Sequence, residues 1–253
     1  MNTDDFAASQ KEREWFHTLT VPPGAWAVIR VDGRTFSKLT EAHFGKPFDK
    51  RMLEHMTAAA IALMTEFGAV YGCTHSDEIS VALPPDCQLF GRGLEKLVSV
   101  SAGICSAAFT AAAGLHAHFD SRVWIGNSAD DVVDYFSWRQ LDAARSALGA
   151  WCYWTLRQAG NSAREATAAL TGATTADQNE LLYQHGINFN DVPSWQRRGI
   201  GLHWQERQKQ GSDPRDGTKT VAIRRHLQIN DDLPSKDEYR AMVVAAIMTG
   251  PRS

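Results

Sequence analysis

The sequence predicts an α+β fold in which an antiparallel sheet carries helices on one face. Three observations lead to this expectation. The first half of the 253-residue chain alternates short β-rich runs with two long apolar patterns of helical spacing. Two of the β-rich runs are separated only by a short turn, as in a hairpin. The resulting order of strand, helix, hairpin, helix and strand is typical of the split βαβ, or ferredoxin-like, arrangement.

The elements of the first half follow from local patterns. Four predicted strands are short runs of β-branched and aromatic residues bounded by turn formers, namely 25–31, 69–71, 79–83 and 121–125. Two predicted helices have apolar residues at helical spacing, namely 52–67 and 94–113. Gly68 follows the first of these helices as a natural stop.

The second half is expected to be mainly helical, with a β-hairpin near its end. Asp130 or Asp131 can cap a long helix that runs toward Gln158, with a bend near 137–138 or at Gly149. The remaining predicted elements are a short helix and two strands, namely 163–170, 200–207 and 219–227. A loop rich in turn formers, QKQGSDPRDG, joins those two strands.

Composition limits the partners and the compartment. A formal net charge of -3 argues against a chain that coats nucleic acid through its overall charge, so an RNA would need a local basic patch. The four cysteines form no C-x-x-C pair, which favours reduced thiols over a disulfide framework or a zinc site. The N-terminal stretch is too polar for a signal peptide, and no apolar run approaches the ~20 residues of a membrane span. We therefore expect a cytoplasmic protein with no membrane partner.

Acidic residues stand at two places where strands meet turns. Asp32 ends the first strand in IRVDGR, and Ser76, Asp77 and Glu78 stand side by side at the mouth of the predicted hairpin in YGCTHSDEISVAL, whose turn is expected at 72–76. Taken alone, an acidic hairpin turn is more often turn chemistry than a metal site. If the first strand and the hairpin lie side by side at the sheet centre, however, Asp32 and Asp77 can face each other. Paired carboxylates in such positions hold two Mg²⁺ ions in palm-type polymerases and nucleotide cyclases.

A triphosphate would also need cations. Lys46 stands between a glycine and a proline in HFGKPFDKR, a turn that can direct its ammonium at phosphate oxygens, although a solvated loop lysine is the simpler interpretation. The chain contains neither a P-loop sequence nor G-x-G-x-x-G, which removes the P-loop and Rossmann alternatives. The histidines show no zinc-binding spacing.

A run of cations near the C-terminus could hold RNA. It comprises Arg197, Arg198, Arg207, Lys209, Arg215, Lys219, Arg224 and Arg225. Only three acidic residues lie within the same stretch. An ordinary solvated hairpin explains the pattern equally well.

Six sequence blocks occur in the order found in the tRNA-histidine guanylyltransferase superfamily. They are IRVDGRTFSKLTE, FGKPFD, YGCTHSDEISVAL, FDSRV, DYFSWRQLD and LTGATTADQNELLYQHGINFND. The chain resembles this superfamily over roughly residues 10–205. The resemblance implies a polymerase-like palm over residues 1–128, packed with a helical region and C-terminal hairpin over 129–253. It also implies a nucleotidyltransferase that adds nucleotides to the 5′ end of tRNA in the 3′-to-5′ direction.

The resemblance further implies roles for individual residues. Asp32 and Asp77 match catalytic carboxylates that bind two Mg²⁺ ions, and the carbonyl of Gly33 matches a further ligand. The matches to nucleotide-binding positions are Arg34, Thr35, Phe36, Lys46, Ser76 and Glu78. The matches to positions that handle RNA or nucleotide are Arg139, Asp177, Asn179 and Arg198. ATP and GTP would be substrates, the partner would be tRNA or another structured RNA with a free 5′ end, and the family's assembly would be a homotetramer.

Two positions depart from the family pattern. Ala144 stands where eukaryotic members have histidine, and Gln178 stands where a lysine is expected. These changes favour templated repair of 5′-truncated tRNA over untemplated guanylylation of histidine tRNA. Two other classes stay open. A palm-type nucleotide cyclase or protein-directed nucleotidyltransferase would keep the carboxylates without binding RNA, and a non-catalytic RNA-binding module would not need them.

Overall fold

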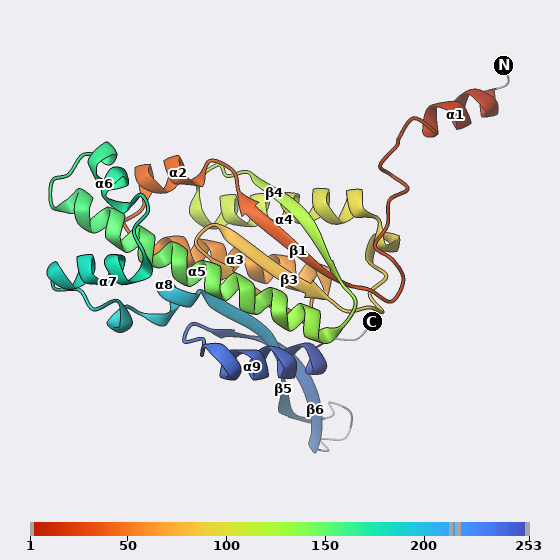
Figure 1. Cartoon of the computed structure of the whole chain (residues 1–253). Coiled ribbons are helices and arrows are strands. Elements are labelled where there is room, and N and C mark those ends of the chain that lie inside the picture. Colours follow the sequence, from red (N-terminus) through yellow and green to blue (C-terminus); the bar gives the residue numbers. More distant parts are fainter. Residues whose placement is uncertain (1–2, 213–214, 216–218, 251–253) are drawn as a thin grey trace.

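A computed structural model of the chain describes residues 3–212, 215 and 219–250. At its centre lies a six-stranded antiparallel sheet with the order β4-β1-β3-β2-β5-β6 (Figure 1). The strands are β1 (Trp26–Gly33), β2 (Tyr71–His75), β3 (Glu78–Leu83), β4 (Phe119–Gly126), β5 (Ile200–Ser212) and β6 (Lys219–Asn230). The first strand therefore lies beside the hairpin, as the sequence predicts.

The helices surround this sheet. They are α1 (Thr3–Lys11), α2 (Phe36–His43), α3 (Lys50–Phe67), α4 (Leu94–Ala113), α5 (Ala129–Gln158), α6 (Ala163–Leu170), α7 (Thr175–Gln184), α8 (Ser194–Arg198) and α9 (Lys236–Thr249), with short 3₁₀ turns at Leu89–Arg92 and Phe189–Asp191. The long predicted helix of the second half is a single 30-residue element. Ser128, rather than Asp130 or Asp131, is its N-cap residue, and Asp131 completes the capping box.

Alternation along β1 divides its side chains between two cores. Ala27, Ile29 and Val31 belong to the core on the side of α3 and α4. Trp26 and Val28 point the other way and belong to the core beneath α5 and α9. Because successive side chains of a strand face opposite sides, both faces of the sheet are covered. Figure 1 shows α5 and α9 on one face, with α3 and α4 behind the sheet.

The C-terminal hairpin continues the same sheet. Thr74 of β2 pairs with Ile200 of β5, and Tyr71 pairs with His203. Gly201 lies between them, where an added Cβ would approach the Tyr71 hydroxyl to 3.1 Å. The second half of the chain thus adds two strands beside the hairpin that carries Asp77.

Among the described residues, only α4 is long and apolar enough to cross a membrane by length and composition, with a mean hydropathy of 1.4. The prediction that no apolar run approaches this length is therefore wrong for α4. Leu97, Cys105 and Phe109 of α4 are buried in the core shared with α3 and the sheet. These residues lie on the face of α4 that packs against the core.

Candidate active site

Strand register brings three acidic residues to one face of the sheet. Asp32 pairs with Glu78 of β3 and with Asp120 of β4. Directly paired residues of antiparallel strands point to the same face. At the end of β1, the N–H of Gly33 donates a hydrogen bond of 3.0 Å to the carbonyl of Asp77. The expectation that β1 and the acidic hairpin turn lie side by side is confirmed.

The acidic hairpin turn is tight and strained. His75 pairs with Glu78, so Ser76 and Asp77 alone form the loop. Ser76 takes a left-handed φ of 55°, which a two-residue hairpin turn requires but which disfavours a side chain with a Cβ. The turn ends the hairpin beside a cavity of about 280 Å³, which both Asp32 and Asp77 line.

The surroundings of Asp32 and Asp77 disfavour the charged form of both carboxyl groups. Burial, followed by the nearby charge of Asp32, raises the pKa of Asp77. Burial raises the pKa of Asp32 as well, with further contributions from Glu78 and Asp120. Two repelling, partly desolvated carboxylates form a site whose charge a divalent cation would neutralise.

The donor set fits Mg²⁺. The described residues include no group of three or more acidic, histidine or cysteine side chains placed to hold a metal. Asp32 and Asp77 are therefore a two-carboxylate set, which leaves other coordination positions to backbone, substrate oxygens and water. Mg²⁺ is commonly bound through one or two carboxylates plus phosphate oxygens.

Lys46 lines a cavity that shares Asp77 with the Asp32 cavity but does not include Asp32. This second cavity, of about 360 Å³, is lined by Lys46, Asp77 and Trp154 among others. The Lys46 Nζ donates to the Thr40 hydroxyl at 2.6 Å and lies 5.5 Å from the centre of the Trp154 ring. Burial lowers the pKa of Lys46, while Glu41 and Asp77 oppose that shift. The predicted phosphate-binding cation is thus adjacent to the carboxylates.

In the segment after Gly33, Phe36 is buried in the core whereas Arg34 and Thr35 are exposed. Phe36 is buried, and its ring packs against Phe109 and Phe119 at centroid distances of 5.2 and 4.9 Å. The ring also fills the space that a Cβ at Gly33 would need. Phe36 also lines the Lys46 cavity. Arg34 and Thr35 are exposed, and Thr35 begins α2 in the left-handed conformation. Their predicted nucleotide contacts stay predictions.

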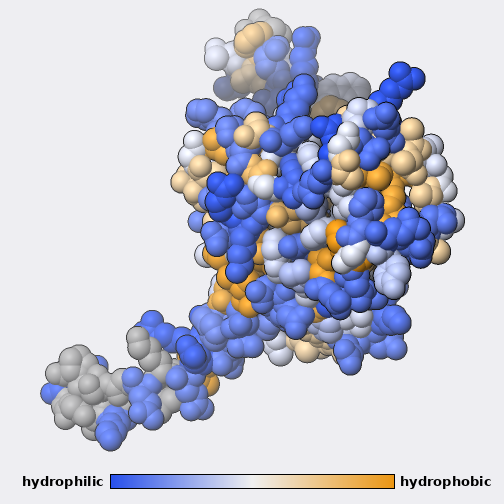
Figure 2. Space-filling model, turned by 90° about the vertical axis from the view of Figure 1, so that its left-hand side faces the viewer, coloured by the Kyte–Doolittle hydropathy of each residue, from blue (hydrophilic) through white to orange (hydrophobic). Residues whose placement is uncertain are grey.

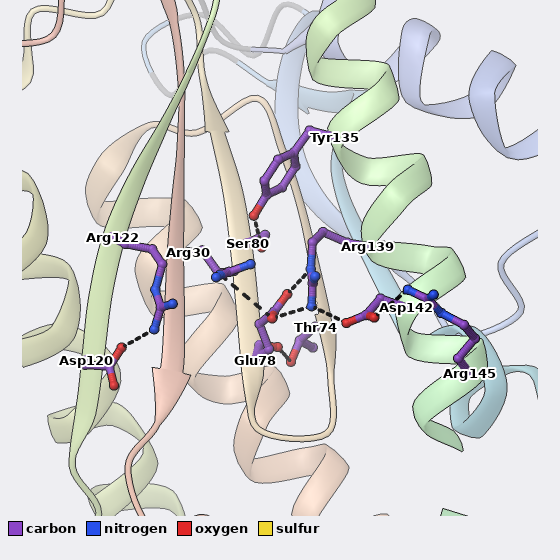
Figure 3. Close-up of polar contacts among 10 residues, drawn as sticks. All are labelled: Arg30, Thr74, Glu78, Ser80, Asp120, Arg122, Tyr135, Arg139, Asp142 and Arg145. Carbon is purple, nitrogen blue, oxygen red and sulfur yellow. Dashed lines mark hydrogen bonds and ion pairs between the residues drawn. The ribbon is translucent and has the colours of Figure 1, made fainter. Parts of the chain in front are cut away.

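Arg139 of α5 reaches the site, but its guanidinium is occupied. It donates to both Glu78 carboxylate oxygens, at 2.7 and 2.6 Å, and to Asp142 at 3.0 Å (Figure 3). Asp142 in turn accepts from Arg145 at 2.9 Å. Arg30 lies 3.9 Å from the same Glu78 carboxylate. Glu78 is therefore enclosed by arginines, and Arg139 binds protein carboxylates where the resemblance implied RNA or nucleotide.

The other residues implied in RNA or nucleotide handling divide into two groups. Arg198 lines the Asp32 cavity, where its Nε donates to the Leu233 carbonyl at 2.6 Å. Asp177 caps α7 by accepting from the backbone and hydroxyl of Thr174, at 2.9 and 2.7 Å. The Asn179 amide donates to a carbonyl of its own helix. Asp177 and Asn179 line neither the Asp32 cavity nor the Lys46 cavity.

The basic run is spread over several elements. Arg197 and Arg198 end α8, whereas Arg207, Arg224 and Arg225 are exposed on the β5–β6 hairpin. That hairpin projects from the body, and Figure 2 shows mostly hydrophilic residues along the part of the projection that is coloured. The side chain of Lys209 lies outside the described part of the chain. A role of this surface in RNA binding stays a prediction.

Sequence patterns alone did not identify several residues that line the site. His75, Gln140 and Tyr239 line the Asp32 cavity, and Trp154 lines the Lys46 cavity. Trp154 belongs to an aromatic stretch of α5 for which packing is the simpler expectation. Tyr239 comes from α9, more than 200 residues after Asp32, and no local signal marks it.

Comparison with known proteins identifies the family. The family described as tRNAHis guanylyltransferase matches residues 8–127, and the family described as Thg1 C terminal domain matches residues 130–243. A probable tRNA(His) guanylyltransferase of Drosophila melanogaster is 35% identical over 197 residues, which cover 72% of this chain and 68% of that protein. The tRNA(His) guanylyltransferase of Debaryomyces hansenii is 35% identical over 210 residues, covering 76% and 77%.

Solved structures share the fold. A bacterial tRNA(His) guanylyltransferase (Thg1)-like protein in complex with ATP superposes with a TM-score of 0.74 at 24% identity, covering 96% of this chain and 99% of that one. The tRNA(His) guanylyltransferase of Saccharomyces cerevisiae superposes with a TM-score of 0.68 at 25% identity, covering 75% and 90%. With the paired carboxylates in place, the chain belongs to the tRNAHis guanylyltransferase family and is a nucleotidyltransferase.

Proposed function

We propose that this enzyme adds nucleotides to the 5′ end of tRNA in the 3′-to-5′ direction. The observation that carries the proposal is the meeting of Asp32 and Asp77 at one cavity, with Lys46 in a second cavity that shares Asp77. Membership of the family supports tRNA as the substrate. Bound ATP in a structural neighbour supports a nucleoside triphosphate as the second substrate.

The proposed reaction has two phosphoryl transfers. An oxygen of the RNA 5′-monophosphate first attacks the α-phosphorus of ATP or GTP, and pyrophosphate leaves. The 3′-hydroxyl of the incoming nucleoside triphosphate then attacks the activated 5′-phosphorus of the RNA, and the nucleoside monophosphate leaves. An RNA that already carries a 5′-triphosphate needs only the second transfer, which releases pyrophosphate.

The chain contributes position and charge to these transfers. Asp32 and Asp77 would hold two Mg²⁺ ions, which lower the pKa of an attacking hydroxyl and neutralise phosphate charge when bound. Lys46 would bind the triphosphate through its ammonium, which the Thr40 hydroxyl holds in place. Arg198 supplies a further cation at the Asp32 cavity. Phosphoryl transfer depends mainly on such positioning and charge stabilisation.

We also propose that the opposite RNA strand selects the added nucleotide. Ala144 and Gln178 replace the histidine and lysine of the family pattern, so two polar groups that could discriminate a base are missing. Ala144 lies on α5 beside a cavity of about 450 Å³ that Arg198 and Tyr239 also line. Pairing with a template can supply the discrimination that these positions no longer provide.

One assay tests both proposals. The protein is incubated with Mg²⁺, labelled nucleoside triphosphates and 5′-truncated tRNAs that differ only at the opposing nucleotide. Extension by the complementary nucleotide is expected. Addition of G opposite every template base would contradict templated addition but keep tRNA as the substrate. A cyclic or protein-linked nucleotide would favour the cyclase or protein-directed alternative, and no product with any RNA would favour a non-catalytic binding module.

A homotetramer in the cytoplasm is proposed as the working form. The N-terminal segment projects from the body (Figure 1), and its Trp15 and Phe16 are 80% and 71% exposed. Exposed aromatic residues of this kind mark contact surfaces. The four cysteines are free, which supports a reducing compartment. Light scattering should give a mass four times that of the 28.0 kDa chain, falling when Trp15 and Phe16 are both changed to Ser.

A further inference from the structure

The turn that carries Asp77 is attached to α5 on its Glu78 side. Arg139 forms two charge-assisted hydrogen bonds to the Glu78 carboxylate, at 2.7 and 2.6 Å (Figure 3). The Arg139 side chain is only 13% exposed and that of Glu78 only 18%. A bidentate pair with this little exposure fixes both distance and orientation. Glu78 directly follows Asp77, so the pair restrains the catalytic turn itself.

The same turn is attached to α5 on its His75 side as well. The His75 Nε2 donates to the Gln196 backbone carbonyl at 2.9 Å. The Gln196 side-chain oxygen accepts from the Trp151 indole N–H at 3.1 Å. Gln196 belongs to the short helix α8, which therefore connects the hairpin to a second point on α5.

The two attachments lie on either side of the reaction cavities. Arg139 and Trp151 are twelve residues apart, about 18 Å along a helix. Between them α5 places Ser146 in both cavities that flank Asp77. The left-handed Ser76 makes this turn costly to hold without outside contacts. The turn thus depends on α5 for its position relative to Asp32.

We infer that Arg139 and Trp151 are positioning residues for nucleotidyl transfer, with Arg139 acting through Glu78 instead of through contact with nucleotide or RNA. This inference rests on the proposed function and adds how the Asp77 turn is held in position relative to Asp32. A displacement of about 1 Å in a reacting group can lower a rate by about 10²-fold. Removing one partner of a weakly exposed pair also leaves the other charge unpaired, so the turn would move.

A double-mutant cycle tests the Arg139 attachment. Arg139→Gln and Glu78→Gln should each lower kcat for tRNA extension by roughly 10- to 100-fold, while KM for nucleotide and RNA stays nearly constant. The double variant should be no worse than either single variant, because both remove the same attachment. A raised KM, or an Arg139 effect that persists undiminished in the Glu78→Gln background, would show direct substrate contact and overturn the inference.

A matched control uses another ion pair of α5. Arg240 of α9 donates to Asp134 and Ser137 of α5 at 2.6 and 3.4 Å, and no hydrogen bond or ion pair among the described residues joins it to the hairpin. Arg240→Gln should keep full kcat. A comparable loss of kcat in this control would mean that any weakening of α5 suffices, which contradicts a specific role of Arg139.

The second attachment is tested by Trp151→Phe, which keeps an aromatic ring and removes the indole N–H. A lower kcat at unchanged KM is expected, and an unchanged kcat would overturn that part of the inference. Hydrogen exchange of the 71–83 amides without substrate gives an independent measurement. Exchange should be faster in Arg139→Gln and Trp151→Phe than in Arg240→Gln, and equal rates would contradict the attachments. If the wild type extends no RNA, the proposed function fails while this measurement still tests the positioning.

Discussion

The hairpin turn of Asp77 and the first turn of α7 illustrate two uses of an aspartate. Asp77 is largely buried beside Asp32, and its pKa is raised. Asp177 is exposed, and hydrogen bonds from Thr174 lower its pKa. Both lie in sequence blocks that match the family. The difference teaches that a carboxylate already satisfied by its own helix cap is structural, whereas one held near a like charge is available to a cation.

The largest expected effect is at the hairpin. Asp77→Ala should lower nucleotide addition by roughly 10³-fold or more, because losing one of two carboxylates removes several kcal/mol of charge stabilisation. The measurement is single-turnover extension of a 5′-truncated tRNA at saturating Mg²⁺. Near-normal turnover would remove Asp77 from the catalytic site. Asp177→Ala in the same assay is the comparison, and it should stay near the wild-type rate.

Lys46→Ala should have the next largest effect, and on one substrate only. Losing a charged hydrogen bond to phosphate should weaken nucleoside triphosphate binding by roughly tenfold or more. The affinity for tRNA should change little, because the Lys46 cavity adjoins Asp77 and not the projecting hairpin. Separate titrations of nucleotide and RNA measure this. Lys38→Ala, on the exposed side of α2, is the control, and equal losses for both substrates would indicate a structural lysine.

Much of the fold could be predicted from the sequence because its signals are local. The second predicted helix, 94–113, matches α4, and the predicted run 79–83 lies within β3, whereas β2 begins at Tyr71, where the predicted run 69–71 ends. The position of β1 beside the acidic hairpin followed from one assumption about strand order, which the register of β1 and β3 confirms. Alternation, caps and turn formers act over a few residues, so they can be recognised without tertiary information.

The parts that could not be predicted depend on contacts between distant residues. Nothing near Arg139 in the sequence indicates that Glu78, which is 61 residues away, occupies its guanidinium. The side chain of Phe36 lies next to a functional motif but is required by the core. The capping role of Asp177 was recognisable, since Thr174 and Asp177 have the spacing of a capping box. The family resemblance instead led to the prediction that Asp177 handles RNA or nucleotide.

The thermal stability of the metal-free protein should depend on pH in opposite ways for variants of Asp77 and of Asp177. Because the folded-state pKa of Asp77 is raised, its contribution to stability becomes unfavourable as pH rises above the ordinary aspartate pKa and is fully unfavourable above the raised value. Asp77→Asn should therefore raise the Tm by a few degrees in EDTA at neutral pH, and the gain should shrink as pH falls. A lower Tm at neutral pH would show that burial and the charge of Asp32 do not control this carboxylate.

The smallest expected effect is at the first turn of α7, where the carboxylate stabilises the fold at neutral pH instead of destabilising it. The folded-state pKa of Asp177 is lowered, so its stabilising contribution is present above the ordinary aspartate pKa and is lost as pH falls through the lowered value. Asp177→Ala should lower the Tm slightly at neutral pH, and the difference from wild type should vanish in acid. Thr174→Ala removes the other half of the same capping box and should produce a similar shift.

The turnover of both variants should be unchanged, because neither residue lines a described cavity beside Asp77. Loss of activity in Asp177→Ala, with Thr174→Ala fully active and equally destabilised, would show that this carboxylate acts on substrate.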